Sequence, residues 1–215
     1  MTDSRLADKT AAAIARKILG GEWQNGYKLP PDSELCAEYG VSRTALREAL
    51  RILTAKGLLF AKPRAGTCLT APQDWSLWDS DILRWLSKCP THAGFLAHAH
   101  KMRQTIEPAI IAQISKSTEE SPEEDREEAK RNLQTALRHL QTTPTLEAEC
   151  AFIDALYSAA TNPFAHRLRL LVHYILEHRM KAPIPLADYT ALVAAISQGQ
   201  AEQATALSKK MLVDF

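Results

Sequence analysis

The sequence lacks several features that mark particular classes of protein. No apolar run approaches the roughly 20 residues that a membrane-spanning helix needs. The first residues, 1–5, lack the basic-then-apolar pattern of a secretory signal. Cysteine is scarce and scattered, without a Cys-x-x-Cys pair, at Cys36, Cys68, Cys89 and Cys150. A disulfide framework and a cysteine zinc site are therefore not expected, and the expected location is a reducing cytoplasm.

A strong net charge is also missing, which at first argues against a nucleic-acid-binding protein. The 215 residues include 26 Lys/Arg and 25 Asp/Glu, for a formal charge of +1, and 46% are hydrophobic, as in a globular protein. The charges are segregated, however: residues 43–64 carry six basic side chains against Glu48 alone, a net charge of +5. Over 119–128, seven of ten residues are acidic, which is typical of a solvated helix face. The near-neutral total conceals a basic segment.

A helix-turn-helix pattern coincides with that basic segment. Helical spacing of apolar residues predicts a first helix over 6–19 and a short second helix over 33–39. Gly40 suits the left-handed position after a helix, and Ser42 is placed to cap a third helix that runs to about Lys56. The predicted inward face of the third helix consists of Leu46, Ala49, Leu50 and Leu53.

The other faces of the third helix are basic. Arg43, Thr44 and Arg47 lie near its start, whereas Arg51 and Lys56 lie farther along and are expected to meet phosphates or solvent. Residues 58–60 and 67–70 read as two strands, joined by a basic tip over 63–66. A helix fits the major groove, and arginine pairs bidentately with guanine. The alternative is that these arginines only solubilise a helical hairpin, with Arg47 paired to Glu48 or Glu38.

These residues resemble the GntR family of bacterial regulators. The resemblance rests on 29–35 (LPPDSEL), 41–50 (VSRTALREAL), Gly57-Leu58 and Gly66-Thr67, and it covers about residues 5–70. It implies a winged helix-turn-helix domain that contacts operator DNA. The DNA-binding residues that it implies are Ser33, Ser42, Arg43, Thr44, Arg47, Arg64 and Gly66.

The first motif departs from the family pattern at two positions. Ser33 stands where the family usually has an arginine, so one DNA contact is weakened or replaced. Pro31 stands where a capping serine is usual, which leaves Asp32 as the expected cap.

A tryptophan-rich segment follows. Trp75, Trp78, Ile82 and Trp85 have helical spacing and predict an apolar seam on one helix, with a sugar-binding platform as the alternative. Asp79 and Asp81 are expected to be surface charges of that helix. The string over 78–85 resembles the corresponding segment of galactonate-operon repressors and their sugar-acid-responsive relatives.

The remaining sequence predicts an all-helical bundle of six or seven helices, since no segment has the alternation of a strand. Ser121-Pro122-Glu123-Glu124 has the form of a helix start with a serine cap. Later helices are predicted over 146–160, 163–180, 188–198 and 202–213. The expected fold class is mainly α: a winged helix-turn-helix domain over 1–73, a joint over 74–91 and a helical bundle over 92–215.

The bundle resembles the ligand-sensing FCD domain of the FadR branch of the family. The matching motifs are 102–109 (MRQTIEPA), 160–163 (ATNP) and 195–200 (AISQGQ). The family usually holds a divalent metal here, but the aligned positions are Glu149, Ile153, Tyr189 and Met211. Since these residues do not form a nitrogen and oxygen site, no metal or other cofactor is expected. His166 and His173 are expected to be surface or core polar groups rather than ligands.

The resemblance implies an effector site in the bundle, formed by Arg103, Glu107, Glu149 and Tyr189. Arg103 either grips the carboxylate of a small sugar acid or forms a simple ion pair with Glu107 one turn away. The expected function is a homodimeric repressor that binds a palindromic operator and is controlled by that effector. One alternative is a DNA-binding regulator with a purely structural bundle. Another is a helical-bundle enzyme. No catalytic pattern in the sequence supports this alternative, so the protein is not expected to be an enzyme.

Overall fold

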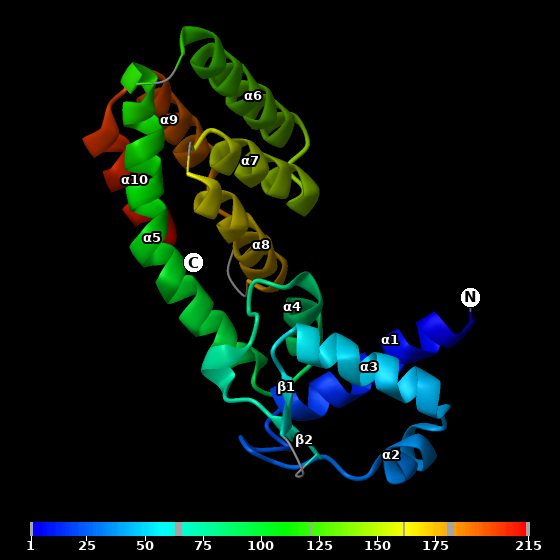
Figure 1. Cartoon of the computed structure of the whole chain (residues 1–215). Helices are drawn as coiled ribbons and strands as arrows, with labels where there is room; N and C mark the ends of the chain where they lie inside the picture. Colours follow the sequence, from blue (N-terminus) through cyan, green and yellow to red (C-terminus); the bar gives the residue numbers. More distant parts are fainter. Residues whose placement is uncertain (1, 63–65, 121, 161, 180–182, 214–215) are drawn as a thin grey trace. The chain divides into compact units, whose positions relative to one another are not determined.

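The computed structural model describes residues 2–62, 66–120, 122–160, 162–179 and 183–213. These residues form ten α-helices, one 3-10 helix and two strands, so the prediction of a mainly α fold is confirmed (Figure 1). The chain divides into two compact units, Met1–Gly94 and Phe95–Phe215. Within the ranges described, no helix combines the length and the apolar character that crossing a membrane requires.

The first unit is a small helical domain with a two-stranded hairpin. Its elements are α1 (Thr2–Leu19), α2 (Asp32–Tyr39), α3 (Arg43–Ala55), β1 (Leu59–Lys62), β2 (Gly66–Leu69), the 3-10 helix η1 (Pro72–Asp74) and α4 (Ser80–Leu86). The strands pair antiparallel, with Leu59 opposite Leu69. Helix α1 packs against both α3 and α4, and α2 packs against α3. The apolar faces of these helices form a core that includes Ile14, Ile18, Leu35, Leu46, Leu53 and Ile82.

The turn between α2 and α3 forms as the sequence predicts. Gly40 adopts φ +63°, and its N–H donates to the Cys36 carbonyl to end α2. Ser42 caps α3, its Oγ accepting a hydrogen bond from Ala45 N at 3.1 Å. The predicted inward face of α3 is buried except at Leu50, which is half-buried. Two short helices joined by a tight turn therefore present α3 as an outward-facing recognition helix.

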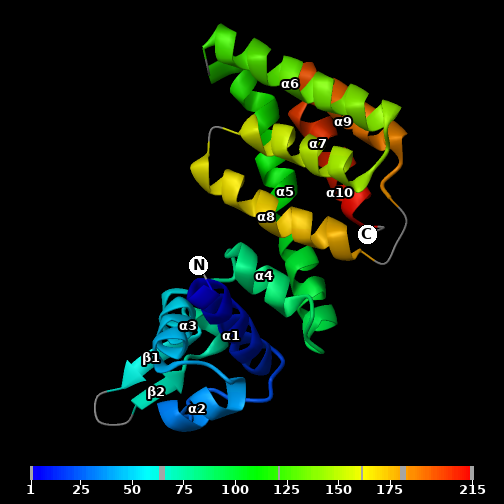
Figure 2. The same cartoon turned by 90° about the vertical axis from the view of Figure 1, so that its right-hand side faces the viewer.

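The second unit is a bundle of helices. Its elements are α5 (His92–Glu120, beginning in the first unit), α6 (Glu123–Thr142), α7 (Leu146–Ser158), α8 (Pro163–His178), α9 (Leu186–Ser197) and α10 (Ala201–Val213). Helix α7 lies side by side with both α6 and α8, and α9 contacts α6 and α10 (Figures 1 and 2). The core includes Leu133, Phe152, Ile153, Leu156 and Ile196. The predicted helical bundle is confirmed for the part of the chain that the structure describes.

Helix starts in the bundle follow capping chemistry. The expected cap Ser121 lies outside the described residues; α6 begins at Glu123, with Pro122 before it and three acidic residues in the first turn. Acidic side chains there favour a helix start because they face its positive end. Thr145 caps α7 through Ala148 N, and Asn162 caps α8 through Phe164 N.

The tryptophan stripe is only partly helical. Ile82 and Trp85 lie on α4 and are buried, but Trp75 and Trp78 precede that helix, and Trp78 is 43% exposed. The cause is Asp79, which caps α4 and starts the helix one residue later. The predicted continuous seam is therefore wrong. By its packing α4 belongs to the first unit, and the functional division at residues 74 and 92 stays a prediction.

Candidate DNA-binding surface and buried polar cluster

The start of α3 exposes three side chains that can read DNA. Arg43, Thr44 and Arg47 are all exposed, while the opposite face of the helix is buried in the core. The Ser42 hydroxyl is engaged as the helix cap, so Ser42 holds this end of α3 in shape as predicted. The arrangement leaves the guanidinium groups pointing away from the core, where they can meet base edges or phosphates.

Arg47 has an acidic neighbour that differs from both residues expected from the sequence. Its Nε lies 3.6 Å from Asp32 Oδ2, and the Arg47 side chain is 76% exposed. An exposed pair at this distance is weak, so it leaves Arg47 available to a stronger anion. Asp32 does not cap α2 as expected: Pro31 occupies the cap position without a side-chain hydrogen bond, and Asp32 is the first helical residue.

The remaining predicted contacts surround the start of α2 and the hairpin. Ser33 is exposed in the first turn of α2. Gly66 begins β2 at φ +99°, a conformation that side chains rarely adopt, whereas Arg64 lies outside the described residues. A hollow of about 520 Å³ separates these two places, lined in part by Lys28, Pro31, Leu50 and Gly66. The half-buried state of Leu50 follows from its position in this hollow.

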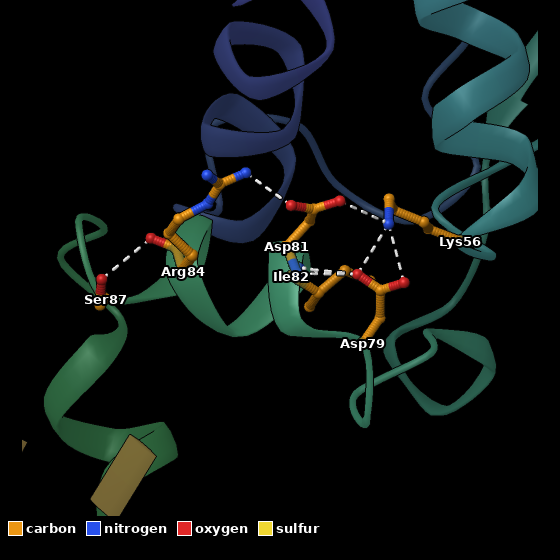
Figure 3. Close-up of polar contacts among 6 residues, drawn as sticks. All are labelled: Lys56, Asp79, Asp81, Ile82, Arg84 and Ser87. Atoms are coloured by element: carbon orange, nitrogen blue, oxygen red, sulfur yellow. Dashed lines mark hydrogen bonds and ion pairs between the residues drawn. The ribbon is translucent and has the colours of Figure 1, made fainter. Parts of the chain in front are cut away.

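Of the two basic residues beyond the start of α3, Arg51 is exposed to solvent as expected, whereas Lys56 is not. Arg51 donates two hydrogen bonds to Glu48, at 2.9 Å and 2.6 Å. Lys56 instead donates to both carboxylate oxygens of Asp79 and pairs with Asp81 (Figure 3). Asp79 and Asp81 are therefore not simple surface charges. The basic surface of α3 is concentrated at its N-terminal end.

The bundle contains a buried polar cluster, hereafter the buried cluster, whose first half centres on Glu107. Arg103 donates to Glu107 from Nε at 2.7 Å and from Nη2 at 3.2 Å, both on α5. Tyr157 of α7 donates its hydroxyl to Glu107 Oε2 at 2.7 Å. All three residues are at most 5% exposed. The ion pair given as one alternative for Arg103 and Glu107 is thus present, and it lies in the interior of the bundle.

The second half of the buried cluster centres on Glu149. Its Oε1 accepts from Arg179 Nη1 and from the Tyr189 hydroxyl, each at 2.6 Å. Glu149 and Tyr189 are at most 3% exposed. A buried carboxylate needs such partners because its charge is otherwise costly in an apolar interior.

Charges in each half of the buried cluster affect the pKa values of groups in the other half. Burial raises the pKa of Tyr189, as do the Glu149 carboxylate and, to a smaller degree, Glu107, while the Arg103 charge acts in the opposite direction. Burial also raises the pKa of Tyr157, and the nearby Glu107 adds to this effect. For Arg103, burial opposes the charged form, but Glu107 outweighs it and the pKa is raised. The two phenols therefore remain protonated donors at neutral pH.

Sequence reasoning missed Tyr157 and Arg179. Tyr157 lies eight residues after Glu149 on the same helix, so helical spacing placed it on the same face and could have found it. Arg179 follows α8 and is separated from Glu149 by 30 residues, and no local pattern marks it.

Comparison with known proteins agrees with this arrangement. Residues 6–69 match the family described as bacterial regulatory proteins, gntR family. The chain is 30% identical to the uncharacterized HTH-type transcriptional regulator YieP of Escherichia coli K12, with 90% of this chain and 86% of that protein covered. The chain belongs to the GntR family. This GntR regulator is also 24% identical to the galactonate operon transcriptional repressor of E. coli K12, over 94% of this chain and 92% of the repressor.

The fold has counterparts among solved structures. One is Lar, which controls the expression of the Listeria monocytogenes agr system: 21% identical, with 96% of this chain and 93% of that chain covered, at a TM-score of 0.56. The relatives named here are transcription regulators rather than enzymes. The protein is accordingly a DNA-binding transcription regulator, and the residues that match the family, 6–69, lie within the first unit.

The residues at the family's metal positions do not fit a metal in this GntR regulator. Ile153 and Met211 are packed in the apolar core, and Glu149 Oε1 is already bound by Arg179 and Tyr189. In the residues that the structure describes, no group of three or more His, Cys, Asp or Glu is placed to hold an ion. His166 contacts the Ala160 carbonyl instead.

Proposed function

We propose that the protein is a repressor, acting in the cytoplasm as a homodimer without a cofactor or enzymatic activity. Each protomer inserts the start of α3 into one half-site of a palindromic operator, because a twofold dimer matches a twofold site. The observation that supports this is the exposed trio Arg43, Thr44 and Arg47 at the start of a helix whose opposite face is buried in the core. Ser33, Arg64 and Gly66 are proposed to flank it at the DNA backbone and the minor groove.

The buried cluster is the proposed effector site. Arg103 and Glu107 would meet a carboxylate and a hydroxyl, and Glu149 and Tyr189 would hydrogen-bond further hydroxyls. Guanidinium groups bind carboxylates bidentately, and a carboxylate accepts from hydroxyls. The relation to a galactonate operon repressor supports a sugar acid as the effector class.

One observation favours a second candidate, a bundle that is purely structural. Two arginines face two glutamates in the buried cluster, so its formal charges cancel without a ligand. A sugar acid would have to compete with Glu107 or Glu149 for a guanidinium. A protein in which these pairs never open would bind DNA without an effector.

Thermal melting of the pure protein separates the two candidates. The panel is D-galactonate and D-gluconate, with the uncharged polyol galactitol as the control ligand. A sugar acid at 100 times its Kd should stabilise the protein by about 2.7 kcal/mol, which corresponds to roughly 5–10 °C in Tm. No shift with any acid would favour the structural bundle.

Variants localise the site. Tyr189→Phe removes one hydroxyl and leaves the ring in place, and Arg103→Met removes a guanidinium; both should abolish or reduce the shift. Arg138→Met on α6 is the matched control, because Arg138 is exposed and its side chain donates a hydrogen bond to Thr135 one turn away. An undiminished shift in Tyr189→Phe and Arg103→Met would place the ligand elsewhere.

A further inference from the structure

The recognition helix ends in a charged contact with the start of α4. Lys56 follows the last residue of α3, and its Nζ lies 2.7 Å from each carboxylate oxygen of Asp79 and 2.9 Å from Asp81 Oδ2 (Figure 3). Only 14% of the Lys56 side chain is exposed. A lysine that served DNA phosphates would instead extend into solvent, as the flexible stem of lysine readily allows.

The two carboxylates are themselves held in place. Asp79 caps α4 and accepts from Asp81 N at 2.9 Å and from Ile82 N at 3.3 Å. Asp81 also accepts from Arg84 Nη2 at 2.5 Å. Lys56 is therefore bound to groups that are fixed to the start of α4.

The main chain reinforces the contact. Ser76 N donates to the Lys56 carbonyl at 3.1 Å, and the Lys56 ammonium lies 5.7 Å from the centre of the buried Trp85 ring. Burial opposes the charged form of Lys56, but the bonds to Asp79 and Asp81 outweigh it and raise its pKa. Burial likewise opposes the charged form of Asp79, yet the bonds from Lys56 and the helix N–H groups lower its pKa. Both partners are charged at neutral pH.

The charges of this contact cancel. Lys56 and Arg84 face Asp79 and Asp81, so the group adds no attraction for DNA as a whole. What the contact does supply is a fixed attachment of the C-terminal end of α3 to α4.

The length of α3 makes that attachment matter at its other end. Its 13 residues extend about 20 Å at 1.5 Å per residue. A tilt of about 10° about Lys56 would move the start of the helix by roughly 3 Å. This displacement is about the donor–acceptor distance of a hydrogen bond. Bidentate contacts from Arg43 and Arg47 would not survive such a displacement.

We propose that Lys56, held by Asp79 and Asp81, is a positioning residue for operator recognition that sets the orientation of α3 without touching DNA. The proposal rests on recognition through α3. A neutral variant at either end of the contact should therefore weaken binding to the cognate sequence and leave the general attraction for DNA unchanged.

The test compares Lys56→Met with Asp79→Asn. The probes are a duplex selected by the wild-type protein from a random library and a scrambled duplex of the same composition. Asparagine retains the capping oxygen at position 79, so Asp79→Asn removes the charge and not the cap. Each variant should lose on the order of tenfold in affinity for the selected duplex, with little change on the scrambled one.

The direction of the affinity change in Asp79→Asn distinguishes positioning from overall electrostatics. Removing a negative charge should strengthen DNA binding if only overall electrostatics matter, whereas positioning predicts weaker binding. The double variant should lose about as much as Lys56→Met alone, because Lys56→Met already removes the contact with Asp79. Asp8→Asn is the charge-matched control: Asp8 is exposed on α1, and binding should stay at or slightly above the wild-type level.

The salt dependence of DNA binding tests whether Lys56 contacts a phosphate directly. The slope of log K against log salt should stay at its wild-type value in Lys56→Met, whereas loss of one phosphate contact would reduce it by about 0.9. A reduced slope with equal losses on both duplexes would overturn the proposal, as would unchanged or tighter binding by Asp79→Asn. If Lys56→Met does not fold, Asp79→Asn decides alone.

Arg43→Ala in the same assay tests recognition through α3 itself. If Arg43→Ala binds the selected duplex normally, the hypothesis of recognition through α3 fails, and not only that of its positioning by Lys56.

Discussion

The arginines of α3 differ in their surroundings, and this difference predicts their contributions to DNA binding. Arg43 is exposed and Arg47 has only the distant Asp32, whereas Arg51 is bound twice by Glu48. Arg43→Ala and Arg47→Ala should each cost about 1–3 kcal/mol on a selected operator duplex. Fluorescence anisotropy measures this loss.

Arg51→Ala is the control for these two variants. It should cost less than about 1 kcal/mol, because Arg51 lies farther from the helix start and its guanidinium already donates two hydrogen bonds to Glu48. Equal losses for all three arginines would contradict the assignment of base contacts to the first turn.

Glu149 illustrates a residue whose importance comes from burial. Glu149→Gln should leave the Arg179 charge without its partner and lower the free energy of unfolding by about 3–5 kcal/mol. Urea denaturation at neutral pH measures it. Asp154→Asn, on the same helix but 44% exposed, should cost at most about 1 kcal/mol. A double variant with Arg179→Met should recover part of the loss; if it loses still more, the pair does not account for the effect.

At the scale of elements, the junction between α3 and β1 depends on one glycine. Gly57 adopts φ +75°, and a Cβ there would lie 2.5 Å from the Asp74 carbonyl oxygen. Gly40 also has a positive φ of +63°, yet nothing lies within 4 Å of its would-be Cβ. Gly40→Ala should cost about 1 kcal/mol from backbone strain alone.

Gly57→Ala should cost at least about twice as much, because the clash adds to the strain. Thermal melting of both variants measures the difference. Equal destabilisation would show that the Asp74 segment moves away without cost, and that η1 is not held firmly against the end of α3.

At the scale of the whole molecule, the protein should work without a metal. Its buried cluster uses Arg179 and Tyr189 where a metal would bind the carboxylate of Glu149, and Ile153 and Met211 offer no oxygen or nitrogen. Dialysis against a chelator should therefore leave both Tm and operator affinity unchanged. Elemental analysis after gentle purification is the measurement, and one zinc, nickel or manganese ion per chain would contradict the prediction.

Much of the fold could be predicted because its signals are local. The spacing of Leu46, Ala49 and Leu53, the cap at Ser42 and the turn at Gly40 each act within a few residues, and all three appear in the structure. The prediction of a continuous helical tryptophan stripe was wrong for a local reason that residue spacing does not reveal. Asp79 caps a helix, so the periodicity that began at Trp75 was interrupted.

The sequence by itself determined the helical elements, the winged helix-turn-helix and the face of α3 that points outward. It could not determine the partners of the charged residues. Lys56 meets Asp79 across 23 residues and Arg179 meets Glu149 across 30, and neither separation has a periodicity. Only the packing of α3 and α4 against α1, and of the helices within the bundle, brings these charges together. Charged side chains removed from water take the nearest opposite charge, and that neighbour is decided by tertiary structure.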